Sequence, residues 1–234
     1  MDGASTVIEI GPGKGALTEC LLEHASRVVA IEVDAVLVHY LRQTFRDAVA
    51  AGKLEIVEGD ILKADLAAFG GRPAIAGNLP YYITSPILDK VFALGGHWER
   101  AVFLVQAEVA ARLTASPGSR DFGYLSVLAQ IHAHAETLFP VPRDAFRPPP
   151  KVDSAVVRLT PRDSAKELGI ADVAGFLKFA QACFRHKRKT LRNNLAPVYG
   201  NERVDALPEA LFGAKARAEQ LSVARLAAIY HCLE

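Results

Sequence analysis

The sequence contains no apolar run that approaches the roughly 20 residues needed to span a bilayer. Its first residues also show no basic segment followed by an apolar one, so a secretory signal is not visible. We therefore expect a cytoplasmic protein.

Cysteine is scarce, with only Cys20, Cys183 and Cys232 among 234 residues. No two of them have CxxC spacing, and an odd number argues against a disulfide framework, so a reducing compartment fits. We expect each cysteine to pack as a small side chain rather than to act as a nucleophile. His132 and His134 alternate and His186 sits among cations, so the histidines form no ligand set and we expect no metal site.

Net charge is nearly absent, because 27 basic residues are balanced by 26 acidic ones to give +1. The distribution is uneven, since basic side chains crowd into one short stretch near the C-terminus. They are Arg185, His186, Lys187, Arg188, Lys189 and Arg192. Such a cluster on a near-neutral protein indicates a docking face for an acidic partner such as RNA phosphates. A solvated helix face is the alternative interpretation.

Strand and helix patterns alternate through the first half of the chain. Short β-branched runs predict strands, and apolar residues at helical spacing separate them. The expected strands are Val7–Ile10, Val28–Glu32, Leu54–Val57, Ala74–Gly77 and Ala101–Val105. This alternation predicts an α/β fold with a mostly parallel sheet that is covered on both faces.

The second half has a different pattern. Residues 124–131 are expected to be helical, and 136–140 and 152–159 are expected to be strands joined by the proline-rich loop 146–151. Three consecutive prolines stiffen that loop, which we expect to hold Phe146 in an exposed position. Beyond Pro161 the pattern is helical. We place a boundary near Thr160, with an α/β domain over 1–160 and a helical domain over 161–234.

A glycine-rich turn, Gly11-x-Gly13-x-Gly15, follows the first strand. It matches neither the dinucleotide fingerprint nor the P-loop, so a cofactor without phosphates fits better. Glu32, which ends the second strand, is the expected partner of ribose hydroxyls. A plain strand-to-helix turn and a surface carboxylate are the alternatives.

Asp60 and Asn78 follow the third and fourth strands. Asp60 can accept a hydrogen bond from an adenine amino group, or it can serve as a helix N-cap. We expect the ends of the strands to meet at one site. The candidate cofactor-binding residues are Glu9, Gly11, Gly13, Glu32, Asp60 and Asn78.

The tetrapeptide Asn78-Leu79-Pro80-Tyr81 is the most specific signal. An adenine N6 lone pair is delocalised into the ring and is a poor nucleophile. An Asn oxygen and a backbone carbonyl beside proline can accept both N6 hydrogens, which orients the lone pair for attack on a methyl group. Tyr81 and Phe146 can stack on a base taken out of its helix. A proline turn with a core tyrosine is the alternative.

At these residues the chain resembles the ribosomal RNA adenine N6,N6-dimethyltransferase family. The motifs that carry the resemblance are residues 9–18, 32–34, 59–60, 77–86, 146–154 and 184–191, so it covers nearly the whole chain. Family members usually also have a segment before the first strand with a Gln-x-Phe-Leu-like motif that closes over the cofactor. The printed sequence has no such motif ahead of Val7.

The resemblance implies a seven-stranded, Rossmann-like fold that uses S-adenosylmethionine, with a small helical C-terminal domain that meets RNA. It implies cofactor roles for Gly11, Glu32, Asp60 and Asn78. It implies roles at the target adenine for Asn78, Leu79, Pro80, Tyr81 and Phe146. The candidate RNA-binding residues are Arg185, Lys187, Arg188, Lys189 and Arg192.

The expected activity is dimethylation of two adjacent adenosines near the 3′ end of small-subunit (16S) rRNA, by a monomer acting on a 30S precursor during ribosome biogenesis. One alternative is a large-subunit rRNA adenine methyltransferase of the antibiotic-resistance type. Another is a ribosome-assembly binding factor with weak or lost catalysis. The triple-proline loop and the segment 184–191, which we expect to be helical, favour the first interpretation.

Overall fold

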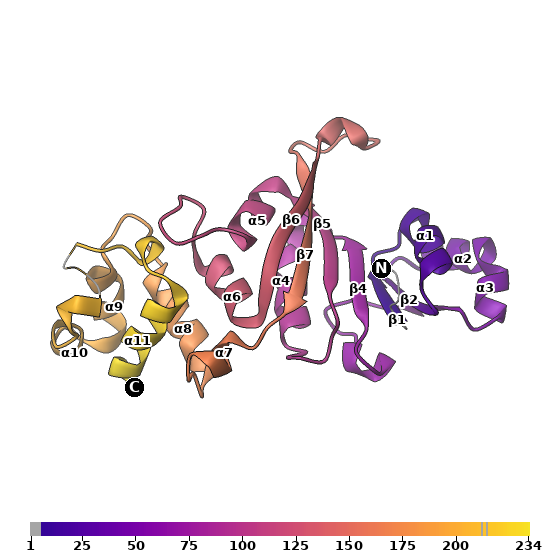
Figure 1. The fold of residues 1–234 in the computed structure, drawn as a ribbon. Helices are drawn as coiled ribbons and strands as arrows, with labels where there is room; N and C mark the ends of the chain where they lie inside the picture. The colour runs from indigo at the N-terminus through magenta and orange to yellow at the C-terminus, as the bar shows by residue number, and fades with distance from the viewer. Residues whose placement is uncertain (1–5, 212, 214) are drawn as a thin grey trace. The chain divides into compact units, whose positions relative to one another are not determined.

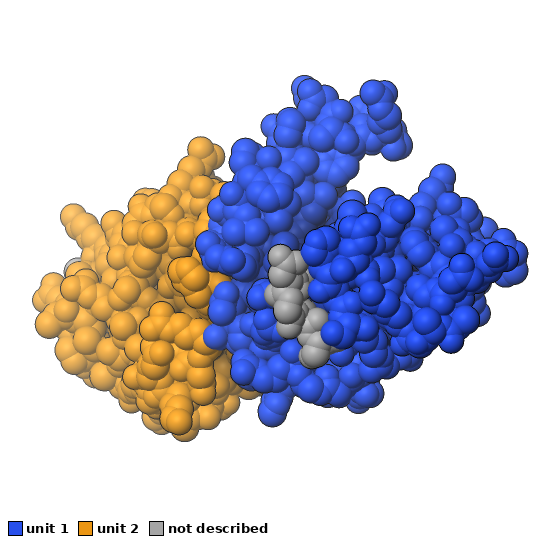
Figure 2. All heavy atoms as spheres, turned by 45° about the vertical axis from the view of Figure 1, so that its right-hand side comes forward, with its two compact units in different colours: residues 1–110, 136–161 blue, residues 111–135, 162–234 orange. Residues whose placement is uncertain are grey.

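The computed structural model describes residues 6–211, 213 and 215–234. The chain forms two compact units, one of residues 1–110 and 136–161 and the other of residues 111–135 and 162–234 (Figure 2). The segment 111–135 thus packs with the C-terminal part, whereas a single boundary near Thr160 would assign it to the first unit.

A seven-stranded sheet forms among the described residues, in the order β3-β2-β1-β4-β5-β7-β6 (Figure 1). The strands are β1 (Thr6–Ile10), β2 (Arg27–Glu32), β3 (Leu54–Glu58), β4 (Ala74–Asn78), β5 (Ala101–Gln106), β6 (Ala133–Val141) and β7 (Ser154–Pro161). The pairs β3-β2, β2-β1, β1-β4 and β4-β5 are parallel, and β7 runs antiparallel to β5. The predicted mostly parallel seven-stranded sheet is confirmed.

Helices follow the strands of the first unit, as the alternating pattern predicted. They are α1 (Ala16–His24), α2 (Ala35–Thr44), α3 (Arg46–Ala50), α4 (Thr84–Phe92) and the start of α5 (Ala107–Leu113). Val7, Val28, Val29 and Ile75 on the central strands are fully buried. Such continuous apolar strands are typical of a sheet that is covered on both faces.

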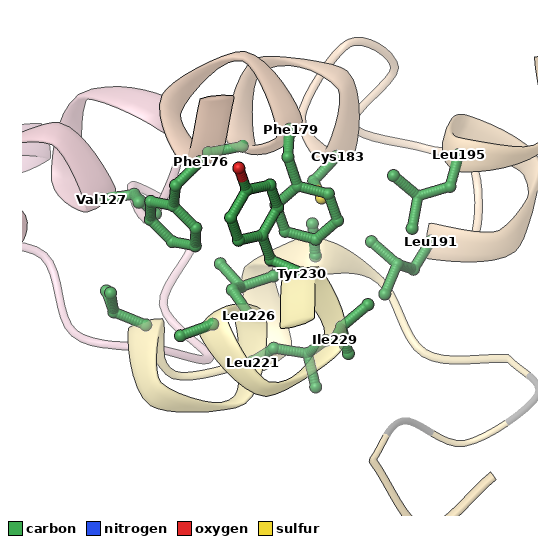
Figure 3. Close-up of a cluster of buried hydrophobic side chains, with 14 of the residues drawn as sticks. Val127, Phe176, Phe179, Cys183, Leu191, Leu195, Leu221, Leu226, Ile229 and Tyr230 are labelled. Atoms are coloured by element: carbon green, nitrogen blue, oxygen red, sulfur yellow. The ribbon is translucent and has the colours of Figure 1, made fainter. Parts of the chain in front are cut away.

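The second unit is helical apart from the first residues of β6. Its helices are α6 (Tyr124–His132), α7 (Ser164–Glu167), α8 (Val173–Cys183), α9 (Leu191–Tyr199), α10 (Asn201–Asp205) and α11 (Val223–Leu233). The rings of Phe176 and Phe179 each lie 5.5 Å from that of Tyr230, which joins α8 to α11 in the core of this unit (Figure 3). Such aromatic contacts add to the apolar burial that holds the helices together.

Single turns of 3₁₀ helix complete the description: η1 (Leu66–Phe69), η2 (Tyr81–Ile83), η3 (Arg143–Ala145), η4 (Glu209–Leu211) and η5 (Ala218–Gln220). None of the helices within the described ranges has both the length and the apolar character to cross a membrane.

Two expectations about helix bounds and cysteine packing are wrong. The basic stretch is not helical, because α8 ends at Cys183 and α9 begins at Leu191, which leaves residues 184–190 as a turn. Cys183 is buried as expected, but Cys20 and Cys232 are exposed and do not pack in the core.

Candidate functional site

The strand ends that carry the candidate residues meet at one edge of the sheet. In the parallel register, Ile10 pairs with Ile31 on one side and with Gly77 on the other. Gly11 and Asn78 therefore leave neighbouring strands at the same level. The strand order reverses between β1 and β4, and ligands of open α/β sheets bind at such a switch point.

The glycine turn is open where a ligand would approach it. Gly11 and Gly13 have φ values of 66° and 59°, and a Cβ added at either would meet no atom within 4 Å. At Gly15 the added Cβ would lie 2.4 Å from the Phe45 ring. Gly15 thus serves packing against α2, while the backbone at Gly11 and Gly13 can contact a ligand closely.

The Glu32 carboxylate holds the glycine turn to the end of β2. One oxygen accepts from the Gly13 amide at 3.2 Å, and the other accepts from the Val33 and Asp34 amides at 2.9 and 3.0 Å. A carboxylate offers about four acceptor positions, so roughly one is left for a ligand hydroxyl. Glu32 is only 7% exposed, which makes it a structural part of the turn as well as a candidate ligand.

Glu9 lies beneath this turn and is 1% exposed. The Thr18 hydroxyl donates to its carboxyl group at 2.6 Å. Burial, opposed by the Thr18 hydrogen bond and reinforced by the Glu32 charge, raises the pKa of Glu9 to about 7. Because Glu9 is buried, it affects the site through its charge and its hydrogen bond to Thr18 rather than by touching a ligand.

Asp60 follows β3 at the same edge. One carboxylate oxygen accepts from the Leu62 amide at 2.9 Å, which shapes the turn after the strand. The side chain is half-buried, and its second oxygen can serve as an acceptor for a ligand amine. The sequence left two roles open for Asp60, a helix N-cap and a contact to a ligand. In this geometry one oxygen caps the turn and the other is available to a ligand.

Asn78 ends β4 and is exposed. In the described part of the chain, its side-chain amide group has no hydrogen-bond partner. Leu79 is 1% exposed, so its side chain belongs to the core and only its backbone can reach a substrate. The preceding Gly77 lies so close to β1 that an added Cβ would be 2.6 Å from the Ile10 carbonyl oxygen. The close approach of β4 to β1 at Gly77 therefore sets the position of Asn78 at the end of the strand.

The carbonyls of Leu79 and Pro80 have different surroundings. The Pro80 carbonyl accepts from the Ile83 amide at 3.1 Å and from the Thr84 hydroxyl at 3.2 Å. Among the described residues, the Leu79 carbonyl receives no hydrogen bond. The Leu79 carbonyl is therefore the backbone acceptor that this turn offers to a substrate.

Tyr81 is fixed through its hydroxyl group. It lies 2.8 Å from the hydroxyl of Ser154, a fully buried residue at the start of β7. Tyr82, the next residue, is 86% exposed. The ring of Tyr81 is thus held at the site while that of Tyr82 extends into solvent.

Phe146 is half-buried rather than exposed as expected. It lines a surface cavity of about 530 Å³ together with Arg143, Arg147 and two prolines. The Arg143 amide donates to the Asp153 carboxylate at 3.0 Å, which ties the start of the loop to its end. The stiffness expected from the prolines is therefore supported by a hydrogen bond across the loop.

The basic cluster lies in the second unit and divides into two parts. Arg185, Lys187, Arg188 and Lys189 are exposed on the turn between α8 and α9. Arg192 instead lies on α9 and pairs with Asp205 through two hydrogen bonds of 2.5 and 2.7 Å. Arg192 is therefore neutralised by an internal partner, and its candidate role in RNA binding is weaker than that of the turn residues.

Several residues that shape the site were not singled out from the sequence. Thr18, Thr84 and Ser154 position Glu9, the Pro80 carbonyl and Tyr81 respectively. Each lies within a motif quoted above, but a hydroxyl side chain has no spacing pattern that would reveal its partner. Asn194 of the second unit, described below, is a similar case.

The donor set fits a cationic nucleoside cofactor without phosphates. The open backbone at Gly11 and Gly13 leaves room for a ligand, and the carboxylates of Glu32 and Asp60 favour amines and hydroxyls over anions. No group of three or more potential metal ligands occurs within the described ranges.

Known proteins share this fold and sequence. Ribosomal RNA small subunit methyltransferase A of Acidobacterium capsulatum is 47% identical, over 99% of this chain and 82% of the relative. The protein of that name from Myxococcus xanthus is 42% identical, over 97% of this chain and 80% of the relative.

Two solved structures are similar over nearly the whole chain. The dimethyladenosine transferase of Plasmodium falciparum superposes with a TM-score of 0.80 and 25% identity, covering 98% of this chain and 90% of its own. The 23S rRNA methyltransferase ErmE superposes with a TM-score of 0.71 and 28% identity, covering 100% and 92%. The family model described as ribosomal RNA adenine dimethylase matches residues 3–234. The chain belongs to the ribosomal RNA adenine dimethylase family.

Proposed function

We propose that this protein is an S-adenosylmethionine-dependent rRNA adenine N6,N6-dimethyltransferase that modifies two adjacent adenosines near the 3′ end of small-subunit rRNA. The observation that carries the proposal is the exposed Asn78 side chain at the switch point of the sheet. It lies beside the Leu79 carbonyl, which receives no hydrogen bond from the residues that the structure describes. The small-subunit activity in the names of the relatives supports the same substrate.

The glycine turn and the acidic strand ends would hold the cofactor. Gly11 and Gly13 present open backbone, Glu32 has about one acceptor position left for a ribose hydroxyl, and Asp60 offers its second oxygen to the adenine amino group. When bound, S-adenosylmethionine supplies an electrophilic methyl group on a sulfonium centre. The buried carboxyl group of Glu9 adds negative potential under a cation at this edge when it is ionised.

The turn after β4 would bind the target base. The Asn78 oxygen and the Leu79 carbonyl can accept the two N6 hydrogens of adenine, which localises the nitrogen lone pair. This contribution is one of orientation and charge placement, and it requires no general base because the ammonium product is acidic. The Pro80 ring fixes the backbone between the acceptor carbonyl and Tyr81.

Two aromatic side chains of the first unit would contact a base taken out of its helix. Tyr81 is held by Ser154, and Phe146 lies beside Arg143 and Arg147 in the loop cavity. Stacking on such rings is worth about 1–3 kcal/mol per base and is available to any flipped nucleotide.

The exposed cations of residues 185–189 would contact rRNA phosphates. We infer that the partner is a precursor of the 30S subunit, that the protein acts as a monomer in the cytoplasm, and that residues 161–234 are the RNA-contacting part. A ribosomal target exceeds the protein in size, so a docking surface away from the reacting atoms adds affinity by simultaneous contact.

A large-subunit target of the ErmE kind is the nearest alternative. The similarity to ErmE is 28%, whereas the relatives named for the small subunit reach 47%. The assignment to small-subunit rRNA is therefore favoured.

The direct test is transfer of labelled methyl groups from S-adenosylmethionine to small subunits that lack the modification, followed by nucleoside analysis. We expect N6,N6-dimethyladenosine at two adjacent positions. Large subunits serve as the competing substrate, and labelling of these instead would contradict the proposal.

Asn78→Ala and Asn201→Ala form a matched pair for the same assay, because both residues are exposed and Asn201 lies on α10 in the other unit. Loss of one orienting acceptor is expected to lower the rate of methyl transfer by about 10²–10³-fold. Asn201→Ala should keep wild-type turnover. Undiminished transfer by Asn78→Ala would remove Asn78 from the mechanism, and retained subunit binding without transfer would show that binding and catalysis separate.

A further inference from the structure

The segment between α8 and α9, here named the basic turn, comprises residues 184–190. It carries four exposed cations, Arg185, Lys187, Arg188 and Lys189. Among the described residues, no carboxylate forms a salt bridge with any of the four. Four like charges this close repel one another, so the shape of the turn depends on hydrogen bonds that hold it in place. The Lys187 side chain forms one of them by donating to the Arg120 carbonyl at 3.3 Å, and the backbone needs a restraint of its own.

Asn194, on α9, supplies that restraint. It is 3% exposed, and its amide nitrogen donates to the carbonyls of Cys183 at 2.9 Å and His186 at 3.1 Å. Its oxygen accepts from the His186 amide at 3.2 Å. One side chain thus satisfies the last residue of α8 and both backbone groups of a residue in the middle of the cationic stretch.

Among the described residues, two of these backbone groups, the Cys183 carbonyl and the His186 amide, have no other partner. The last carbonyls of a helix have no N–H donor within the helix, and Cys183 is the last residue of α8. The Lys189 amide also donates to the His186 carbonyl, at 3.0 Å. The carbonyl of His186 therefore gathers two donors, and the turn closes around it.

Side-chain chemistry explains why this position requires asparagine. The amide group combines two donors with an acceptor, and Asn194 uses all of them. A carboxylate there would repel the two carbonyls. An aliphatic side chain would leave the Cys183 carbonyl and the His186 amide without this partner, and the His186 carbonyl with the Lys189 amide alone.

We propose that Asn194 is a positioning residue that presets the basic turn for rRNA phosphates. The inference rests on the proposed function, since it assumes that the basic turn meets RNA. A turn already in its bound shape avoids the ordering cost that a mobile one incurs on association. Asn194 thus contributes to affinity without contacting RNA.

The test compares Asn194→Leu with Asn193→Leu, because neither changes the charge and Asn193 is exposed one position away. Dissociation constants for unmethylated small subunits are measured over a series of salt concentrations. We expect Asn194→Leu to bind about tenfold more weakly, the effect of ordering one or two side chains. The salt dependence should stay as in the wild type, because all four cations remain. Asn193→Leu should bind as the wild type does.

Hydrogen exchange and a milder variant separate positioning from general destabilisation. The His186 amide should exchange faster in Asn194→Leu while amides of the α11 core keep their protection. If Asn194→Leu does not fold, Asn194→Ser replaces it, since its hydroxyl keeps one donor and predicts a smaller loss. Affinity equal to that of the Asn193 variant, in whichever Asn194 variant folds, would overturn the proposal.

A triple variant, Arg185→Glu with Lys187→Glu and Arg188→Glu, tests the underlying assumption separately. If the basic turn meets RNA, the triple variant binds more weakly and its salt dependence is shallower. An unchanged salt dependence would refute the basic turn as the RNA contact, and with it the role of Asn194. A triple variant that weakens binding beside an Asn194 variant that does not would refute the role of Asn194 alone.

Discussion

The hydroxyl group of Tyr81 lies 2.8 Å from that of Ser154, although 73 residues separate them in the chain. Tyr81 belongs to the turn after β4, and Ser154 is the first residue of β7, where it is fully buried. The hydrogen bond joins the turn that presents Asn78 to the far side of β5. The rotation of the Tyr81 ring is thereby limited before any base arrives.

Tyr81→Phe and Ser154→Ala each remove this hydrogen bond while keeping the aromatic ring. One bond contributes about 0.5–1.5 kcal/mol, so we expect either variant to lower kcat for methyl transfer by about two- to tenfold. The double variant should be no slower than the single ones, because both changes delete the same interaction. Steady-state kinetics on unmethylated small subunits measure the four rates.

Tyr81→Ala provides the contrast, because it removes the stacking surface as well as the bond. We expect it to be slower than Tyr81→Phe by the worth of a stacked base, about 1–3 kcal/mol. Additive effects of Tyr81→Phe and Ser154→Ala would show that Ser154 acts on the site by a different route.

The sheet could be predicted from the sequence because each central strand is a short, mostly apolar run between polar turns. Val7–Ile10 and Val28–Glu32 correspond to β1 and β2 with an error of one residue at one end. The helix faces were less predictable. Val36 and Tyr40 lie at helical spacing with the buried Leu41, yet they are 76% and 45% exposed. Spacing alone does not reveal what covers a helix.

Motif chemistry placed Asn78 and Glu32 at the same edge of the sheet, where the strand register has them. The interactions that fix the site and the basic turn were not predictable, because Ser154 bonds to a side chain 73 residues away and Asn194 bonds to backbone groups. The basic stretch was misassigned as a helix, since an apolar stripe at helical spacing leads into it while α8 ends at Cys183.

Gly77→Ala tests whether the spacing of β1 and β4 places Asn78. The new Cβ would lie 2.6 Å from the Ile10 carbonyl oxygen, so the strands have to separate. We expect a stability loss of about 1–3 kcal/mol, measured by urea denaturation. Displacement of the turn by about 1 Å is also expected to lower kcat/KM by about 10²-fold.

Gly96→Ala is the control for this change, since a Cβ there would meet no atom within 4 Å and the backbone has an ordinary φ. It should alter stability by less than about 0.5 kcal/mol. Full activity in Gly77→Ala would show that Asn78 does not depend on this strand contact.

Glu9 predicts a pH dependence of stability. Its pKa is raised from 4.5 to about 7 in the folded protein, chiefly by burial. The folded state therefore holds this proton more tightly than the unfolded state. The stabilisation is fully present below pH 4.5 and is lost as the pH rises to about 7, by about 3 kcal/mol at most.

Glu9→Gln removes this titration and keeps an acceptor for the Thr18 hydroxyl. The unfolding free energy of the variant, measured in urea at pH 5 and pH 7.5, should fall less between the two than that of the wild type. An identical fall in both proteins would mean that Glu9 does not carry a raised pKa.

Gly175→Ala, in the second unit, has two opposite effects on stability. Alanine is favoured over glycine inside a helix by about 1 kcal/mol. At this position, however, the new Cβ would lie 2.4 Å from the Tyr230 hydroxyl oxygen and 2.3 Å from an oxygen of Asp172, the N-cap of α8. Tyr230 is 6% exposed and packs against Phe176 and Phe179, so it has little room to move. We expect the steric cost of about 1–3 kcal/mol to prevail and to lower the midpoint of thermal unfolding by a few degrees.

Tyr230→Phe separates the two effects, because it removes the hydroxyl that the new methyl group would meet. In that background Gly175→Ala should cost less than in the wild type, since only the carboxyl group of Asp172 still has to shift. Thermal unfolding of the four proteins measures the coupling between the two positions. A Gly175→Ala protein that melts above the wild type would show that helix propensity outweighs the contact with Tyr230, and an equal cost in both backgrounds would show that the Tyr230 hydroxyl is not the obstacle.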